Sequence, residues 1–188
     1  MRAQPWSRTR RPRSPLGAVV VLVAIAVIAL LVAWLQPTPP PLSGRAQAVD
    51  GDTLRIGATR IRLPGIDAVE LDQTCTNEKG DNWNCGFAAR AFLADLVDNR
   101  TTACKPDGRD RYGRVLAKCD AGDGDLGAAV VKAGWAVADV EYGLALVQAR
   151  TGRHGIWSGS FDDPGEWRRS HGADAFDFWA WLMGWFGR

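Results

Sequence analysis

An uncharged apolar run near the N-terminus constrains the fold of this chain more than any other feature. Residues 16–35 carry no charge over 20 consecutive positions and consist mainly of Val, Ala, Leu and Ile. At ~1.5 Å per residue, a helix of this length just crosses the ~30 Å hydrocarbon layer of a bilayer. A buried helix of a soluble core is the weaker interpretation, because the run has no polar face for water. The sequence therefore predicts a transmembrane helix over residues 16–35.

The residues on either side of this run predict its orientation. Residues 1–15 form a basic tail without acidic residues, and its five arginines are Arg2, Arg8, Arg10, Arg11 and Arg13. By the positive-inside rule this tail is cytoplasmic, and residues 36–188 face the periplasm or the cell exterior. The alternative is a cleavable signal peptide, for which Ala46-Gln47-Ala48 has the form of a cleavage site, but the apolar region of such a peptide is usually only ~7–15 residues long.

The rest of the chain has the composition of one globular domain with a nearly neutral charge. The 188 residues include 23 Lys and Arg against 21 Asp and Glu, and without the basic tail 18 basic residues face 21 acidic ones. This composition excludes a wholly disordered chain. It also excludes a protein that holds nucleic acid through bulk positive charge alone.

Four cysteines follow the apolar run, and none of them forms a C-x-x-C pair. An even number in an oxidising compartment predicts two disulfides, whereas zinc binding or thioredoxin-like chemistry is disfavoured. Of the three possible pairings, local geometry favours Cys75–Cys85 across one loop and Cys104–Cys119 across one hairpin. The alternative is four buried free thiols.

A proline-rich extended linker is predicted for residues 36–41, and the folded domain for residues 42–169. Polar and apolar residues alternate as in strands over residues 42–63, with a turn at Gly57-Ala58, and again over 101–105 and 115–120. The part of the chain that joins the last two strands turns at Pro106-Asp107-Gly108.

Helical spacing of apolar residues follows Gly86 and continues to Val97. Further helices are predicted over residues 126–133, with Asp125 as the N-cap, and over 142–150. Strands come first, then a helix, a hairpin and more helices, which is not the alternating order of a parallel sheet. The order indicates a small α+β domain on a barrel-like antiparallel sheet.

Three short segments resemble the signature segments of the staphylococcal nuclease (thermonuclease) family, in the same order and at compatible spacing. They are Val49-Asp50-Gly51-Asp52-Thr53-Leu54, Arg62-Leu63-Pro64-Gly65-Ile66-Asp67-Ala68-Val69-Glu70 and Asp110-Arg111-Tyr112-Gly113-Arg114. Each segment alone is typical of a turn or a solvated connection, but the ordered set is specific. The resemblance implies a five-stranded OB-fold barrel with about three helices, and Ca²⁺-dependent hydrolysis of phosphodiester bonds in DNA and RNA.

The resemblance also assigns roles to individual residues. Asp52, Asp67 and the backbone carbonyl of Ala68 would bind Ca²⁺ through hard oxygen ligands. Glu70 would act as general base on a water molecule, and Arg62 and Arg114 would bind the phosphate and stabilise the transition state. Two tyrosines resemble nucleotide-contacting positions of the family, and a packing role is the alternative for both; they are Tyr112 and Tyr142.

Two features depart from a simple transfer of this site. Val69 stands where the family usually has proline, which predicts a less rigid loop around Glu70. If Gly57-Ala58 forms a strict two-residue hairpin loop, Arg62 pairs with Thr53 and points away from the face of Asp52. A bulge or a longer loop would then be needed to bring Arg62 to Asp52.

The C-terminal tail, residues 170–188, is rich in aromatic residues but too short to span a membrane. Its tryptophans make it a candidate interfacial anchor on the outer leaflet, and the alternative is a tail packed on the core of the domain. The membrane contacts of the chain would then be residues 16–35 and this tail.

Two function classes follow from these observations. The first is a membrane-anchored nuclease whose domain lies outside the cytoplasm and whose substrates are single-stranded DNA and RNA. The second is a catalytically silent nuclease-like OB module that binds nucleic acid or a partner protein. Arg62, Glu70 and Arg114 together favour the enzyme, because a binding module needs no general base.

Overall fold

The computed structural model describes residues 15–34 and 40–171, which belong to two separate compact units divided between Thr38 and Pro39. The first unit contains the 20-residue helix α1, Pro15–Trp34, which coincides with the predicted apolar run to within one residue. Judged by length and apolarity, no helix in the described part of the chain qualifies as a membrane crossing, so the predicted span is not confirmed. The basic tail up to residue 14, the linker up to residue 39 and the aromatic tail after residue 171 lie outside the described residues.

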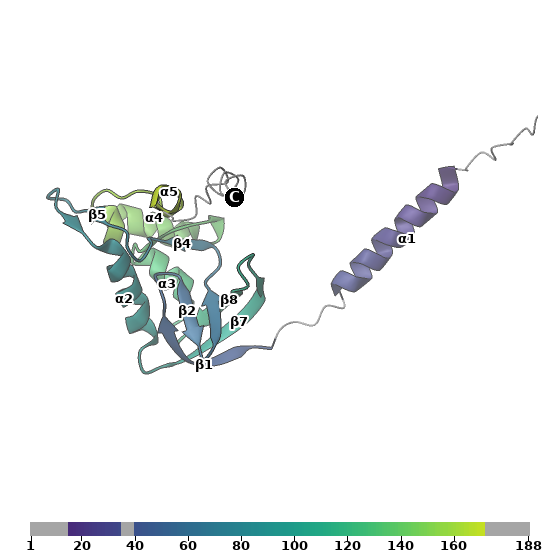
Figure 1. The fold of residues 1–188 in the computed structure, drawn as a ribbon, viewed down its shortest axis with the longest axis horizontal. Helices are drawn as coiled ribbons and strands as arrows, with labels where there is room; N and C mark the ends of the chain where they lie inside the picture. Colours follow the sequence, from purple (N-terminus) through teal and green to yellow (C-terminus); the bar gives the residue numbers. More distant parts are fainter. Residues whose placement is uncertain (1–14, 35–39, 172–188) are drawn as a thin grey trace, which may run out of the picture. The chain divides into compact units, whose positions relative to one another are not determined.

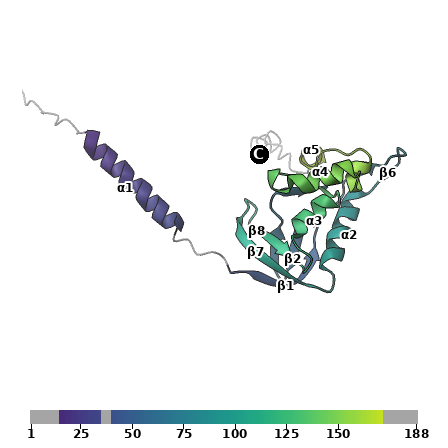
Figure 2. The same cartoon turned by 180° about the vertical axis from the view of Figure 1, so that it is seen from behind.

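The second unit is built on a closed five-stranded barrel, shown from two opposite sides in Figures 1 and 2. Its strands follow the order β1-β2-β3-β8-β7, and only β3 and β8 pair in parallel. They are β1 (Leu42–Ala48), β2 (Thr53–Ile56), β3 (Thr59–Arg62), β7 (Thr101–Arg109) and β8 (Val115–Asp120). The predicted α+β fold with a five-stranded barrel is thereby confirmed.

Helices α2 (Cys85–Val97) and α3 (Leu126–Lys132) each begin after a residue whose side chain caps the first turn, and Asp125 is the cap predicted for the second of them. The Asn84 side chain accepts a hydrogen bond from the N–H of Phe87 at the start of α2. The Asp125 side chain does the same for Ala128 in α3. The remaining helices are α4 (Gly143–Thr151), α5 (Pro164–His171) and the 3₁₀ turns η1 (Val140–Tyr142) and η2 (Gly155–Ser158).

Two small sheets and helix α5 were not predicted. Strand β4 (Ile66–Ala68) pairs with β9 (Ala136–Ala138), and β5 (Cys75–Thr76) pairs with β6 (Asn82–Trp83). Each strand has only two or three residues, which is too short for alternation to be visible in the sequence. The β4–β9 pair is important because it carries Asp67 and Ala68.

Both predicted disulfides are confirmed, and the described residues contain no free cysteine. Cys104 and Cys119 lie directly opposite each other on β7 and β8, so this bond fastens a barrel hairpin. Cys75–Cys85 joins β5 to the first residue of α2. Together the two bonds anchor the barrel and the loop that precedes α2.

The predicted turn at Pro106-Asp107-Gly108 is wrong. These residues belong to β7, where a register shift between Pro106 and Arg109 accommodates the proline that a regular ladder would exclude. The chain reverses later, because Asp110 Oδ1 accepts hydrogen bonds from the N–H groups of Tyr112 and Arg114. The tip of this hairpin therefore carries the third signature segment.

Candidate active site

The β2–β3 hairpin brings Arg62 to Asp52 without a bulge. Arg62 pairs with Thr53, as a two-residue loop requires, yet its Nη1 lies 2.7 Å from Asp52 Oδ1. Asp52 precedes β2 in a bend, where its N–H bonds to Asp50 Oδ1 and its carbonyl accepts from the N–H of Leu63. Strand alternation does not extend to this bend, so the predicted need for a bulge or a longer loop is wrong.

Asp52 is the most buried carboxylate of the site, with 4% of the residue exposed. Its Oδ1 accepts from Arg62 and from the Thr53 hydroxyl, and its Oδ2 accepts from the N–H of Ala68. Burial raises the pKa of Asp52 to about 7, although the Arg62 guanidinium opposes this shift. Additional positive charge near Asp52 would favour its ionised form.

Strand β4 places Asp67 and Ala68 next to this pair. Arg62 Nη2 donates to Asp67 Oδ1 at 2.9 Å and to the carbonyl of Ile66 at 3.2 Å. One guanidinium thus bridges Asp52 and Asp67, which shows that the two carboxylates converge. Its contacts with Asp52 and Asp67 leave the pKa of Arg62 above its ordinary value despite the opposing effect of burial, so Arg62 stays charged.

Glu70 follows β4 in a loop that is held by the buried amide of Gln73. The N–H of Glu70 donates to Gln73 Oε1 at 3.0 Å, and the N–H of Gln73 donates back to the carbonyl of Glu70 at 2.8 Å. Gln73 has no solvent exposure, and Val69 is buried in a cluster with Ala89 and Ile156. These contacts anchor the Glu70 loop without the proline that the family usually has at position 69.

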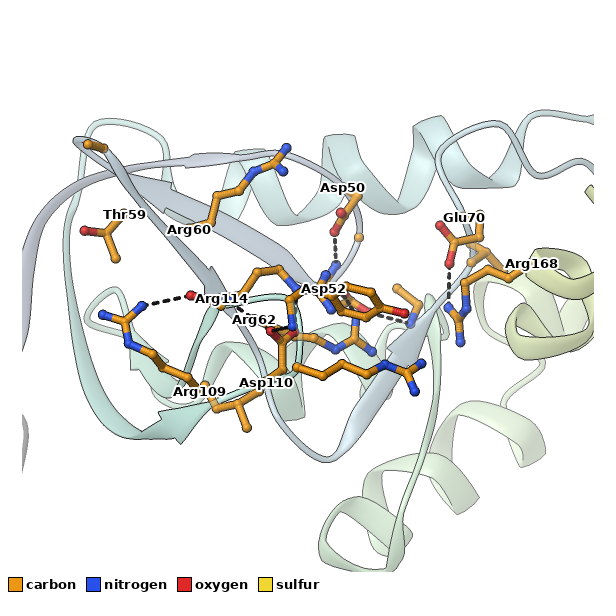
Figure 3. A pocket seen from close by; sticks show the side chains of 18 residues that line it. Asp50, Asp52, Thr59, Arg60, Arg62, Glu70, Arg109, Asp110, Arg114 and Arg168 are labelled. Carbon is orange, nitrogen blue, oxygen red and sulfur yellow. Dashed lines mark hydrogen bonds and ion pairs between the residues drawn. The ribbon is translucent and has the colours of Figure 1, made fainter. Parts of the chain in front are cut away.

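Sequence reasoning missed Arg168, which reaches the same carboxylates from helix α5. Its guanidinium donates to Asp67 Oδ1 and Oδ2 at 3.1 and 2.7 Å. It also donates to Glu70 Oε1 at 2.5 Å (Figure 3). These contacts hold the pKa of Arg168 above its ordinary value, and the hydrogen bonds with Asp67 have the largest effect. Gln73 Nε2 also donates to the carbonyl of Asp162, so one buried amide joins the Glu70 loop to the segment before α5.

The hairpin tip between β7 and β8 contributes Tyr112 and Arg114. Arg114 Nε donates to Asp110 Oδ2 at 2.6 Å, and its guanidinium carbon lies 5.6 Å from the centre of the Tyr112 ring. Desolvation would raise the pKa of Asp110, but hydrogen bonds from Arg114 and Tyr112 lower it overall. Asp110 therefore serves as the ionised partner that orients Arg114. The Tyr112 side chain remains open to solvent.

All these elements surround one cavity of about 1030 Å³ (Figure 3). Most of the predicted site residues line it, namely Asp52, Arg62, Ala68, Glu70, Tyr112 and Arg114. Asp67 lies just outside the lining and is tied to it through Arg62 and Arg168. The lining has six arginines and four acidic residues, so the cavity favours an anion although the domain as a whole is mildly acidic.

Tyr142 does not belong to this cavity. Only 8% of the residue is exposed, and its hydroxyl lies 3.2 Å from both carboxylate oxygens of Asp125. The pKa of Tyr142 is raised mainly by burial, and also by the negative charge of Asp125. Tyr142 therefore packs in the interior and contacts the N-cap of α3, and it does not line the cavity as a substrate contact would.

The donor set fits a hard divalent cation, although no cluster of three or more His, Cys, Asp and Glu side chains capable of holding a metal occurs within residues 15–34 and 40–171. The predicted set has only two carboxylates, from Asp52 and Asp67, plus the main-chain oxygen of Ala68. These are the oxygen ligands that Ca²⁺ and Mg²⁺ prefer. Both carboxylates already form ion pairs with Arg62, and Asp67 also pairs with Arg168, so a bound cation would share them with these guanidinium groups.

Several known proteins are similar to this chain in sequence. The chain is 36% identical over 157 residues to the succinoglycan biosynthesis protein ExoI of Rhizobium meliloti (strain 1021), a match that covers 79% of this chain and 82% of that protein. It is 32% identical over 123 residues to an uncharacterized endonuclease of Escherichia coli, covering 60% of this chain and 74% of the relative. Endonuclease YhcR of Bacillus subtilis (strain 168) matches at 28% over 149 residues, which is 65% of this chain but only 12% of YhcR.

The family model described as "Staphylococcal nuclease homologue" matches residues 60–159. This segment contains Arg62, Asp67, Ala68, Glu70 and Arg114, whereas Asp52 and Arg168 lie on either side of it. The match covers more than half of the chain, and it agrees with the closed barrel and the convergent arginines and carboxylates. The chain belongs to the staphylococcal nuclease homologue family.

Proposed function

We propose that this protein is a Ca²⁺-dependent endonuclease that hydrolyses phosphodiester bonds in single-stranded DNA and RNA. The observation that carries the proposal is the convergence of Glu70, Arg62 and Arg114 on one cavity, beside the buried carboxylate of Asp52. A general base, two planar cationic groups and a set of hard oxygen donors are the groups that metal-assisted hydrolysis of a phosphodiester requires.

The residues divide the work according to their chemistry. Arg62 and Arg114 donate to the phosphate oxygens and stabilise the additional charge that develops when water attacks phosphorus. The Glu70 carboxylate accepts a proton from the attacking water, the P–O bond to the leaving ester oxygen breaks, and that oxygen takes up a proton from solvent. Asp52, Asp67 and the Ala68 carbonyl would hold Ca²⁺, which when bound supplies Lewis-acid polarisation of a phosphate oxygen. Exposed Tyr112 lies at the wall of the cavity, where a nucleotide can contact its ring.

A nuclease-like module that binds nucleic acid or a partner protein without cleaving anything is the second candidate. The contact that favours it is the ion pair between Arg168 and Glu70, which occupies the carboxylate proposed as the base. Glu70 Oε1 is thus already engaged by a guanidinium group. In the enzyme, substrate and cation would have to redistribute these contacts.

We further propose that the domain works outside the cytoplasm, at the outer side of a membrane. The support comes from the two disulfides and from the arginines that precede the uncharged run of residues 16–35. A C-terminal reporter enzyme that functions only in an oxidising compartment should be active in a fusion to the full chain. Activity of a reporter that functions only in the cytoplasm would contradict this location.

Cation dependence tests the enzymatic proposal directly. We expect the full chain to cleave a labelled single-stranded DNA and an RNA of the same length in the presence of Ca²⁺, and to lose this activity with a chelator. The reason is that Asp52, Asp67 and the Ala68 carbonyl would hold the cation, which when bound polarises a phosphate oxygen for attack by water. Gel analysis of the products with Ca²⁺, Mg²⁺ and chelator provides the measurement. Binding without cleavage under every cation would establish the second candidate instead.

A further inference from the structure

A second groove begins where the catalytic cavity ends, and Arg60 lines both of them. The groove has a volume of about 790 Å³ and lies between β1, the β2–β3 hairpin and helix α2. Figure 2 shows α2 beside these strands. Four arginines line it against a single acidic residue, Asp98; they are Arg45, Arg55, Arg60 and Arg90. We call these four residues the arginine groove.

The register of the barrel aligns these arginines, although they are scattered in the sequence. Arg60 pairs with Arg55, and Arg55 pairs with Gln47, so the three side chains form a row across β3, β2 and β1. Arg45 precedes Gln47 by two residues and therefore lies on the same face of β1. The neighbouring apolar residues of these strands point into the barrel, and the row faces solvent.

Most of the charge in this groove is not neutralised by the protein. Arg55 Nη2 donates to the uncharged Gln47 Oε1 at 2.6 Å, and Arg90 Nε donates to the carbonyl of Ala48 at 3.3 Å. None of the ion pairs formed within residues 40–171 includes an arginine of the groove. Their remaining N–H donors are thus available to a ligand with many acidic oxygens.

We propose that the arginine groove binds the phosphodiester backbone of the nucleic-acid strand on one side of the cleaved bond, an inference that rests on the proposed nuclease function. Arg60 and Arg62 lie on the same face of β3, ~6.6 Å apart along the strand. A polynucleotide whose reacting phosphate contacts Arg62 therefore continues past Arg60 into the groove. Arginine is suited to this role because its planar fork donates two parallel hydrogen bonds to a phosphate.

The groove also resolves an apparent conflict in the charge of the domain. A mildly acidic domain does not attract nucleic acid over its whole surface, so contact must be restricted to a basic path. The cavity and the arginine groove form one continuous path of this kind through their shared residue, Arg60. The groove would make the enzyme favour long strands over minimal phosphodiesters.

The test compares a long and a minimal substrate in the full-length protein. The variant Arg45→Gln/Arg55→Gln removes two exposed charges of the groove without touching a residue of the proposed catalytic set. We expect the ratio of KM for a 5′-labelled oligonucleotide of ~20 residues to KM for bis(p-nitrophenyl) phosphate to rise about tenfold. The salt dependence of oligonucleotide binding should fall by ~0.7 in log–log slope for each phosphate contact that is lost.

A matched control removes the same charge elsewhere. Lys79→Gln/Lys132→Gln alters two exposed lysines outside both the cavity and the groove, and should leave the KM ratio unchanged. Equal KM ratios in the wild type and the groove variant, or equal changes in the groove and control variants, would overturn the proposal.

Binding measurements separate this inference from the proposed function. Fluorescence anisotropy with a labelled oligonucleotide in chelator reports the groove even if the protein cleaves nothing. Retained oligonucleotide binding in the groove variant, together with lost binding to an acidic polysaccharide or to vesicles with anionic lipid, would assign the groove to that other ligand and reject our proposal. Absence of cleavage by the wild type under every cation would instead reject the nuclease function.

Discussion

Replacement of Glu70 by glutamine will slow phosphodiester hydrolysis by ~10²–10⁴-fold, the usual contribution of a general base. Glutamine has the same shape, and its Oε1 can still accept the hydrogen bond that Arg168 donates to Glu70 Oε1. The main-chain contacts of residue 70 with Gln73 do not involve the altered side chain. The fold and substrate binding should therefore persist while proton transfer fails. The loss should appear in kcat rather than in KM, measured with saturating Ca²⁺ and a single-stranded oligonucleotide.

Glu166→Gln is the matched control for this experiment. Glu166 is an exposed residue of α5 that lies 3.8 Å from Arg169, so the same chemical change is made two positions from Arg168. Its kcat should equal that of the wild type. A Glu70→Gln variant as active as wild type would exclude Glu70 as the base and would require another residue of the cavity to take the proton.

Replacement of Gly86 by alanine will destabilise the domain by ~3 kcal/mol, at the upper end of the usual cost of overpacking. Gly86 lies in the first turn of α2, where a Cβ would stand 1.8 Å from the carbonyl oxygen of Glu70 and 2.7 Å from the main chain of Leu71. Main-chain atoms cannot rotate aside as a flexible side chain can. Either α2 or the Glu70 loop must move, so both the free energy of unfolding and the cleavage rate should fall. Urea unfolding followed by circular dichroism gives the first quantity, and the oligonucleotide assay gives the second.

Gly143→Ala provides the comparison for this change. Gly143 begins α4 with an ordinary helical φ of −54°, and apart from its chain neighbours and its own helix backbone no heavy atom of the described residues lies within 4 Å of the position of an added Cβ. Alanine should leave stability unchanged or increase it by up to ~1 kcal/mol, because it favours the helix. If Gly86→Ala unfolds at the same urea concentration as wild type, α2 does not rest on the Glu70 loop as described.

The parts of the fold that could be predicted from the sequence are those specified by local chemistry. Alternation and a Gly-containing turn predict the β2–β3 hairpin, and Asp125 predicts the start of α3 because its side chain caps the helix. The disulfide pairs follow from short loops between the cysteines. The catalytic cavity was predictable to the extent that its residues fall in three short, ordered segments.

The remaining features depend on contacts between distant parts of the chain. Arg168 is 98 positions from Glu70, and Gln73 is 89 positions from the carbonyl of Asp162 that it holds, so no local pattern marks either residue. Tyr142 resembled a substrate contact, but its side chain is buried and its hydroxyl lies 3.2 Å from the Asp125 carboxylate at the start of α3. Arg62 was expected to point away from Asp52, but the two side chains meet. Alternation of side chains applies only within the β2–β3 ladder, and Asp52 lies before the first pair of that ladder. The turn expected at Pro106 was wrong because the register shift within β7, which accommodates the proline, has no local sequence signal.

The position of the site residues along the chain limits how far this enzyme can be trimmed. The segment through which the family is detected, residues 60–159, begins after β1 and β2 and ends before α5. A recombinant fragment with those boundaries would lack two of the five barrel strands, β1 and β2. It would also lack the Asp52 carboxylate and the Arg168 guanidinium, which bridges Asp67 and Glu70. The smallest fragment of this chain that keeps all the proposed site residues therefore extends from β1 through helix α5, well beyond the segment that identifies the family.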